Sequence, residues 1–262
     1  MKRAIVTGCS RGIGAAVTVA LLQDGWDVAG ISRTRLMLPN IEHLTWRPID
    51  IASPLAGERL GQTVGEGPLD ALIHCAAIQG PIGLFSGNDQ YEWEMAIWTN
   101  LIGTATVVRA CLPALQCSDD ARILLFSGGG AFNPRPNYSA YAASKAGVVS
   151  LMETLADELL GTNVTVNAVS PGFVPTGIDP HAPVLAHDPD GAIAMERAVA
   201  CVHHLLSPQA RGLTSRTISA EFDDWQNIDE TTVVALNASV MGTRYRHPIA
   251  QLQAKTRART AV

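Results

Sequence analysis

The sequence predicts a single-domain α/β fold in which one doubly wound parallel sheet carries helices on both faces. The chain has 262 residues, of which 47% are hydrophobic and 16% charged, so it can bury one substantial core. Short apolar runs alternate with segments whose apolar residues recur every three or four positions, the pattern of strands followed by helices. The short runs are apolar on both faces, which is typical of parallel strands covered by helices on both sides. Right-handed crossovers between such strands produce a doubly wound sheet.

Each expected element follows from its own residues. The run Ala4-Ile5-Val6-Thr7 predicts the first strand, and the apolar spacing after Gly12 predicts a helix over residues 12–23. A turn at Asp24-Gly25 leads into a second strand over residues 27–32. The further strands are expected over residues 44–49, 69–74, 122–127, 164–169 and 213–220, and the further helices over 55–64, 91–115, 139–160 and 192–206.

Composition narrows the classes of function. The net charge is −5 and no basic run is present, which argues against a nucleic-acid partner. The five cysteines are odd in number and lack a Cys-x-x-Cys pair, which suits a reducing compartment. We find no room for a signal peptide and no apolar stretch of about 18 residues, so we expect a cytoplasmic protein without a membrane partner. No set of His, Cys, Asp or Glu residues has convincing metal-ligand spacing, so no metal site is expected.

A glycine-rich loop joins the first strand to the first helix. Gly8, Gly12 and Gly14 lie where a dinucleotide-binding loop belongs. Without Cβ atoms the chain can turn sharply and bring backbone N–H groups close to a pyrophosphate, at the positive end of the following helix. The alternative is an ordinary tight turn, because glycine is a common turn residue.

Tyr141 and Lys145 lie four residues apart in a predicted helix, so they share one face. A free tyrosine titrates near pH 10, and lowering its pKa by about three units requires about 4 kcal/mol. An ammonium group at about 4 Å supplies about that much at an effective dielectric constant of about 20. The pair can therefore form a proton donor that works near neutral pH. The alternative is a pair of surface side chains with no catalytic role.

The chain resembles the short-chain dehydrogenase/reductase family. The loop Thr7-Gly8-x-x-x-Gly12-x-Gly14 is similar to the nucleotide fingerprint of that family, and Tyr141-x-x-x-Lys145 is similar to its catalytic pair. Further family motifs follow in the same order: Asp50-Ile51, Asn100, and Pro171-Gly172 with Thr176. The resemblance covers about residues 3–220 and implies a Rossmann-type domain over 1–220 that binds a dinucleotide and carries catalysis. Residues 221–262 would form a C-terminal extension packed on this domain or on a neighbouring subunit.

The resemblance also implies residue roles. Tyr141 would protonate the substrate oxygen, Lys145 would bond the nicotinamide ribose, and Asn100 would hold a water that links the lysine to solvent. Ser127 completes the expected catalytic set. The expected cofactor contacts are Gly8, Ser10, Arg11, Gly12, Ile13, Gly14, Ser32, Arg33, Asp50, Ile51, Cys75, Ala76, Ala77, Tyr141, Lys145, Pro171, Gly172, Val174 and Thr176.

The end of the second strand favours NADP over NAD. NAD-dependent members of the family usually carry an acidic residue there, which bonds the ribose 2′-hydroxyl. Here that position is Ser32, followed by Arg33, and Arg11 lies in the glycine loop. Two guanidinium groups can grip a 2′-phosphate, so NADPH is the expected cofactor. The alternative is that both arginines are solvated surface charges.

The sequence departs from the family pattern at the substrate-polarising serine. That serine usually lies thirteen residues before the tyrosine, a position held here by Gly128. Ser127 is one residue early, which in a strand turns a side chain to the opposite face, but the run of three glycines allows the backbone to re-aim it. Tyr138 and Ser139 are the alternative donors. His74-Cys75-Ala76-Ala77 replaces the usual Asn-Asn-Ala-Gly, and we expect a structural histidine and a buried thiol there.

The leading hypothesis is an NADPH-dependent oxidoreductase that reduces a carbonyl to a secondary alcohol, or catalyses the reverse reaction. The alternatives are an epimerase or dehydratase that uses the nucleotide transiently, and a catalytically silent dinucleotide sensor. The expected partners are a small-molecule carbonyl or alcohol substrate and further copies of the chain. A homodimer or homotetramer would form through the helices at 91–115 and 139–160. The proline- and histidine-rich segment 177–189 points to a polar substrate without identifying it.

Overall fold

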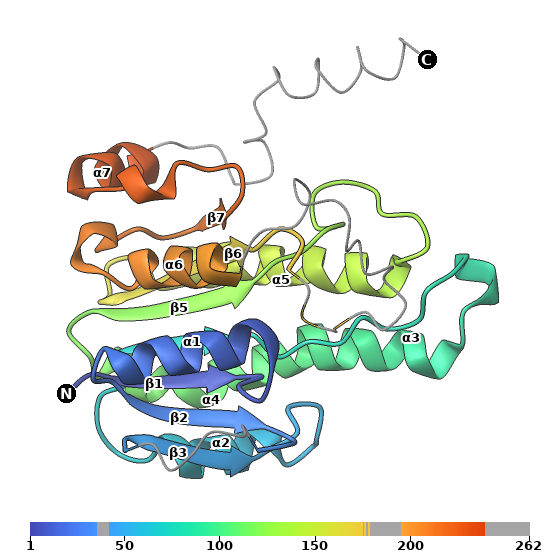
Figure 1. Cartoon of the computed structure of the whole chain (residues 1–262), viewed down its shortest axis with the longest axis horizontal. Coiled ribbons are helices and arrows are strands. Elements are labelled where there is room, and N and C mark those ends of the chain that lie inside the picture. The colour runs from blue at the N-terminus through green and yellow to red at the C-terminus, as the bar shows by residue number, and fades with distance from the viewer. Residues whose placement is uncertain (36–41, 175, 177, 179–194, 239–262) are drawn as a thin grey trace.

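In the computed structural model, which describes residues 1–35, 42–174, 176, 178 and 195–238, seven parallel strands form one sheet (Figure 1). The strand order is β3-β2-β1-β4-β5-β6-β7, and every neighbouring pair is parallel. The predicted fold class is confirmed. The order of the strands reverses between β1 and β4, and ligands of open α/β sheets bind outside the carboxyl ends of the strands at such a point. The strands are β1 (Arg3–Thr7), β2 (Asp27–Ser32), β3 (Leu44–Pro48), β4 (Ala71–His74), β5 (Ala121–Phe126), β6 (Val164–Ser170) and β7 (Arg216–Ser219).

The sheet separates two hydrophobic cores. Successive side chains of a strand point to opposite faces, so Ala4 and Val6 enter one core while Ile5 enters the other. The same alternation places Leu124 in the first core and Leu125 in the second. Both faces of the central strands are therefore buried, which is why their sequences are apolar throughout.

Helices cover both faces of the sheet (Figure 1). Helices α1 (Gly12–Gln23) and α6 (Met195–Leu205) pack together and contribute to the first core. Helices α2 (Ala56–Val64), α4 (Gly103–Gln116) and α5 (Ser139–Glu158) contribute to the second. Short 3-10 turns lie at η1 (Phe85–Gly87), η3 (Pro208–Ala210) and η4 (Trp225–Asn227).

The helix predicted over residues 91–115 is interrupted. It consists of α3 (Gln90–Ile97), a π-helical segment η2 (Trp98–Ile102), and α4. The side chain of Asp89 caps its start by accepting a hydrogen bond from the backbone N–H of Glu92. The π-helical segment carries Asn100, whose side chain is buried. Such segments are frequent at functional sites.

This combined helix bears on the expectation that the chain has no apolar stretch of about 18 residues. Over residues 90–116 it is long and apolar enough to cross a membrane by length and composition alone. Core helices of soluble proteins pass the same test. Here the apolar residues Val107, Cys111 and Leu115 face the second core, so sheet packing accounts for their hydrophobicity.

The chain continues to pack on the domain beyond β7. Trp225 is 5% exposed, and its indole N–H donates to the backbone oxygen of Ala220 at 3.2 Å. Ile228 and Val233, the latter in helix α7 (Glu230–Ala238), also enter the first core. Residues 221–238 therefore complete this core. Residues 239–262 and most of the expected insertion at 177–189 lie outside the described residues.

Candidate active site

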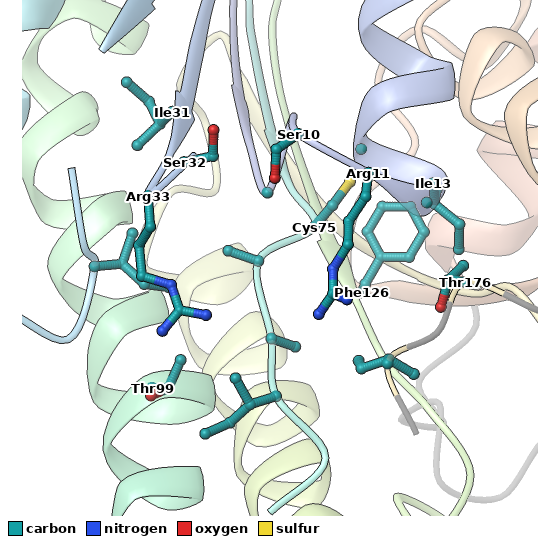
Figure 2. A pocket seen from close by; sticks show the side chains of 18 of the residues that line it. Ser10, Arg11, Ile13, Ile31, Ser32, Arg33, Cys75, Thr99, Phe126 and Thr176 are labelled. Carbon is teal, nitrogen blue, oxygen red and sulfur yellow. The ribbon is translucent and has the colours of Figure 1, made fainter. Parts of the chain in front are cut away.

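The carboxyl ends of β1, β2, β4, β5 and β6 open onto one cavity of about 600 Å³. This volume is within the range of sites for small molecules and cofactors. All of the cofactor contacts expected from the sequence line this cavity, as do Ser127, Thr99 and Phe126. Figure 2 shows side chains from several of these elements around the same space. Asn100 is the one expected site residue outside the wall, and it lies buried behind it.

The glycine loop has the conformation that its sequence requires. Gly8 has a φ of 68°, and a Cβ there would lie 2.9 Å from the backbone nitrogen of Ala76. A Cβ on Gly14 would collide with the carbonyl oxygen of Gly8. Side chains are thus excluded where the loop packs on β4 and on its own helix. No side chain caps the start of α1, and Gly12, Ile13 and Gly14 of its first turn line the cavity, so this helix start suits an anion such as a pyrophosphate.

Ser32 at the end of β2 is held by protein groups. Its hydroxyl donates to the backbone oxygen of Thr34 at 2.6 Å and accepts from the indole N–H of Trp46 at 3.0 Å. The thiol of Cys9 lies 3.2 Å away. With its one hydrogen committed, Ser32 shapes the cavity wall and has no donor left for a ligand.

Two arginines extend into the same cavity. Arg33 follows β2 and Arg11 precedes α1, and both are exposed and line the cavity. Figure 2 shows their guanidinium groups reaching into the space from opposite sides. Asp50 lies farther along the wall, where its carboxylate accepts the N–H of Ala52 at 3.0 Å. The arrangement offers two cations and no carboxylate at the end of β2, which fits a phosphorylated ribose.

Tyr141 and Lys145 reach the cavity from the first turns of α5. They are 9% and 4% exposed. The ammonium of Lys145 donates to the backbone oxygen of Phe126 at 2.8 Å and lies 5.6 Å from the centre of the Tyr141 ring. Burial lowers the pKa of Lys145 to about 8. The ammonium is therefore held by a carbonyl on the same side of the cavity as the Tyr141 ring.

Another cation lies beside the tyrosine. The Arg135 guanidinium carbon is 5.5 Å from the centre of the Tyr141 ring and 4.0 Å from that of Tyr138. Burial raises the pKa of Tyr141, and the positive charge of Arg135 lowers it. Arg135 is therefore a second positive charge beside the Tyr141 ring, in addition to the expected Lys145. The sequence held one signal, an arginine three residues before Tyr138 in the approach to the catalytic helix.

The missing serine position is filled by the tyrosine itself. A Cβ on Gly128 would lie 2.6 Å from the hydroxyl oxygen of Tyr141. Ser127 is 2% exposed and lines the cavity, and its hydroxyl has no hydrogen-bond partner among the described residues. Ser139 does not line the cavity, and its hydroxyl accepts from the indole N–H of Trp93 at 3.0 Å. Of the candidate serines, Ser127 has the hydroxyl that remains open to a ligand.

Asn100 supports the catalytic helix from behind the cavity. Its amide exchanges two hydrogen bonds of 2.8 Å with the backbone of Ile78, and its nitrogen also donates to the hydroxyl of Ser144 at 3.0 Å. Ser144 in turn donates to the backbone oxygen of Tyr141 at 2.8 Å. Both amide hydrogens are thus used by protein groups, so any water on this side chain would bind the remaining lone pair of its oxygen.

His74 connects the glycine loop to the same network. Its Nδ1 lies 2.9 Å from the hydroxyl of Thr7, and its Nε2 lies 2.9 Å from that of Thr104. Thr104 donates to the backbone oxygen of Asn100 at 2.6 Å, so it must accept from an N–H at Nε2, and Nδ1 must accept from Thr7. Burial lowers the pKa of His74 to about 3, which keeps it neutral. This agrees with a structural role. Burial also raises the pKa of the Cys75 thiol, as expected of an inert cysteine.

Comparison with known proteins places the chain in a family. Residues 2–183 match the family model described as short chain dehydrogenase. The chain is 29% identical over 231 residues to the 3-oxoacyl-(acyl-carrier-protein) reductase FabG of Salmonella typhimurium, covering 83% of this chain and 94% of that protein. It is 33% identical over 185 residues to the FabG of Staphylococcus epidermidis, covering 66% and 75%. The chain therefore belongs to the short-chain dehydrogenase/reductase family of oxidoreductases.

Solved structures agree with this assignment. A short chain dehydrogenase from Salmonella enterica serovar Typhi superposes with a TM-score of 0.77 at 26% identity, over 84% of this chain and 96% of that one. A Shigella flexneri short chain dehydrogenase, described as complexed with NADP, superposes with a TM-score of 0.76 at 25% identity, over 84% and 97%. The cavity described above lies where the fold of such enzymes binds its dinucleotide.

Proposed function

We propose that the protein is an NADPH-dependent oxidoreductase that reduces a carbonyl compound to a secondary alcohol, or oxidises the alcohol in the reverse direction. One observation supports this proposal above the others. A single cavity brings the glycine loop, two arginines and the Tyr141–Lys145 pair together. A binding protein without catalysis would need the first two of these features and not the third.

Three residues of the chain have different roles in the proposed reduction. NADPH, when bound, supplies a hydride to the carbonyl carbon. Tyr141 donates its phenolic proton to the carbonyl oxygen as the C–O double bond becomes a single bond. Ser127 donates a hydrogen bond to the same oxygen while negative charge develops there. Lys145, held by Phe126, keeps a positive charge beside the phenol and would bond the nicotinamide ribose of a bound cofactor.

Arg33 and Arg11 support the preference for NADPH over NADH. Their guanidinium groups can hold the 2′-phosphate that distinguishes the two cofactors. The test compares KM for NADPH and NADH in the native protein and in Arg33→Ala. We expect a lower KM for NADPH, and the variant should lose this advantage without a change in KM for NADH. An equal or lower native KM for NADH would refute the preference.

Turnover should first be sought with 3-oxo thioesters, because relatives of the chain are named as 3-oxoacyl reductases. A panel of ketones and sugars follows. Consumption of NADPH with formation of an equal amount of alcohol would support the proposed reaction. Gly128 favours one further candidate, an epimerase that oxidises and re-reduces its substrate. That enzyme would produce an epimer without net consumption of NADPH, so the same assay separates the two reactions.

Ser127→Ala tests the assignment of the oxyanion donor. Removal of one such donor typically lowers kcat by about 10²–10³. We expect a loss in that range, with binding of NADPH unchanged, and steady-state kinetics with the best substrate of the panel would measure it. A loss below about threefold would remove Ser127 from the catalytic residues.

We also propose that the protein works in the cytoplasm as a homodimer or homotetramer. Its five cysteines are free, which supports a reducing compartment. Tyr91, Trp98 and Ile102 are exposed on the α3–η2–α4 helix and offer apolar area for contact with a second copy. Sedimentation of the native protein tests the assembly, and a monomer at micromolar concentration would contradict it.

A further inference from the structure

We propose that Arg135 is a positioning residue for Tyr141: held against the ring of Tyr138, its guanidinium adds to Lys145 a second positive charge that stabilises the phenolate of Tyr141. This inference rests on the proposed function, in which Tyr141 exchanges a proton with the substrate. It assigns a role to a residue outside the expected catalytic set of Tyr141, Lys145, Asn100 and Ser127.

Two aromatic rings fix the position of the guanidinium. Arg135 stacks on Tyr138, with its central carbon 4.0 Å from the ring centre, and this lies well within the range of a cation–π contact. The same carbon is 5.5 Å from the centre of the Tyr141 ring. Stacking on Tyr138 limits the freedom of a long side chain, so its charge remains near Tyr141 instead of moving into solvent.

The glycine run 128–130 creates the space for this arrangement. A Cβ on Gly129 would lie 3.3 Å from a guanidinium nitrogen of Arg135, and one on Gly130 would lie 3.3 Å from the Arg135 Cβ. A Cβ on Gly128 would lie 2.6 Å from the Tyr141 hydroxyl. The three missing side chains therefore leave room for the phenol and the guanidinium together.

No acidic side chain in the described part of the chain neutralises the charge of Arg135 beside Tyr141. In the described part of the chain, no carboxylate forms an ion pair or a hydrogen bond with Arg135. Burial raises the pKa of Tyr141 and the positive charge of Arg135 lowers it, and the ammonium of Lys145, held at the Phe126 carbonyl, lies 5.6 Å from the centre of the same ring. Of the other titratable groups on the elements around α5, His74 and Cys75 are buried and neutral, Glu92 and Glu94 are exposed, and Arg122 in β5 forms an ion pair with Asp120.

The ionisation of residue 141 can be measured without cofactor or substrate. Difluorotyrosine incorporated at position 141 ionises at lower pH than tyrosine, which brings its titration into the range where the protein is folded, and fluorine NMR follows that single site. The titration is compared in the native background and in Arg135→Met, Arg135→Gln and Arg135→Lys. Arg59→Met, which removes an exposed arginine on α2, is the matched control.

We expect the pKa at position 141 to rise by about one unit in Arg135→Met and in Arg135→Gln, a tenfold change in the ionisation constant. Arg135→Lys should restore most of the difference, because it restores the charge, and Arg59→Met should have no effect. An unchanged pKa in both neutral variants would overturn the proposal, as would an equal rise in Arg59→Met. A lysine variant that behaves like the methionine variant would also overturn it, since charge would not be the property that matters. Because neither NADPH nor substrate is present, this result is independent of whether the proposed reaction occurs.

Discussion

At the scale of single residues, Gly128 and Tyr141 depend on each other. A Cβ added at position 128 would lie only 2.6 Å from the tyrosine hydroxyl, which is closer than two non-bonded atoms can approach. A serine at this position is therefore incompatible with the present position of the phenol. The open hydroxyl of Ser127, next to it in the sequence, offers a substitute donor in the same cavity.

Gly128→Ser should accordingly impair the protein instead of restoring the family pattern. The added side chain displaces the Tyr141 hydroxyl, and a shift of about 1 Å at a catalytic group can lower the rate by about 10². Steady-state kinetics should show a fall in kcat of that size with unchanged NADPH binding. Gly61→Ser on α2, where an added Cβ contacts nothing, provides the control. Activity equal to or above the native level in Gly128→Ser would contradict this description of the site.

The sequence was sufficient to predict which residues line the cavity, but not where the charged side chains lie within it. Glycine spacing and motif order were sufficient to select the residues that line the cavity, because βα loops of a parallel sheet converge at one edge. The path of the loop before α5 decides where Arg135 places its charge, and no local pattern encodes it. The commitment of the Ser32 hydroxyl to Thr34 and Trp46 is a tertiary contact of the same kind.

At the scale of elements, a buried hydrogen-bond chain links the glycine loop to the catalytic helix. It runs from Thr7 through His74 and Thr104 to the backbone of Asn100, whose amide then contacts Ser144 in α5. The bounds of α1 and β2 were predicted in full from apolar spacing. The π-helical turn that carries Asn100 was not predicted, because the sequence was interpreted as one continuous helix over residues 91–115.

Thr104→Val tests this chain. The variant keeps the shape of the side chain but leaves the Nε2–H of His74 without an acceptor, and an unsatisfied buried group costs about 1–3 kcal/mol. We expect the free energy of unfolding, measured with urea, to fall by that amount. Thr154→Val removes a similar bond to a backbone oxygen on the exposed face of α5 and should change it by less than about 0.5 kcal/mol. Equal effects of the two variants would show that the chain has no special importance.

At the scale of the whole molecule, the first core is completed by a segment that follows the last strand. Trp225, Ile228 and Val233 pack there, and the imidazole of His204 lies 5.9 Å from the ring of Trp225. The sequence placed this segment outside the main domain because residues beyond 220 show neither a family motif nor a clear strand–helix alternation. Their burial depends on tertiary contacts with α6 and η3, which no local sequence pattern encodes.

Trp225→Ala should therefore destabilise the entire domain. Truncation of a buried aromatic side chain typically costs about 3–5 kcal/mol. Phe222→Ala nearby removes a ring that is 65% exposed and should cost less than about 0.5 kcal/mol. Chemical unfolding followed by circular dichroism measures both variants, and a cost for Trp225→Ala no greater than that for Phe222→Ala would mean that the segment is peripheral.

The most direct test of the account as a whole is Tyr141→Phe, which removes one oxygen atom and the proton it carries. NADPH oxidation is followed with the best carbonyl substrate, and NADPH binding is measured by titration calorimetry on the same preparation. We predict that kcat falls by at least about 10² while the Kd for NADPH stays the same, because proton donation is lost and the nucleotide contacts remain. Undiminished turnover in this variant would contradict the assignment of Tyr141 as the proton donor.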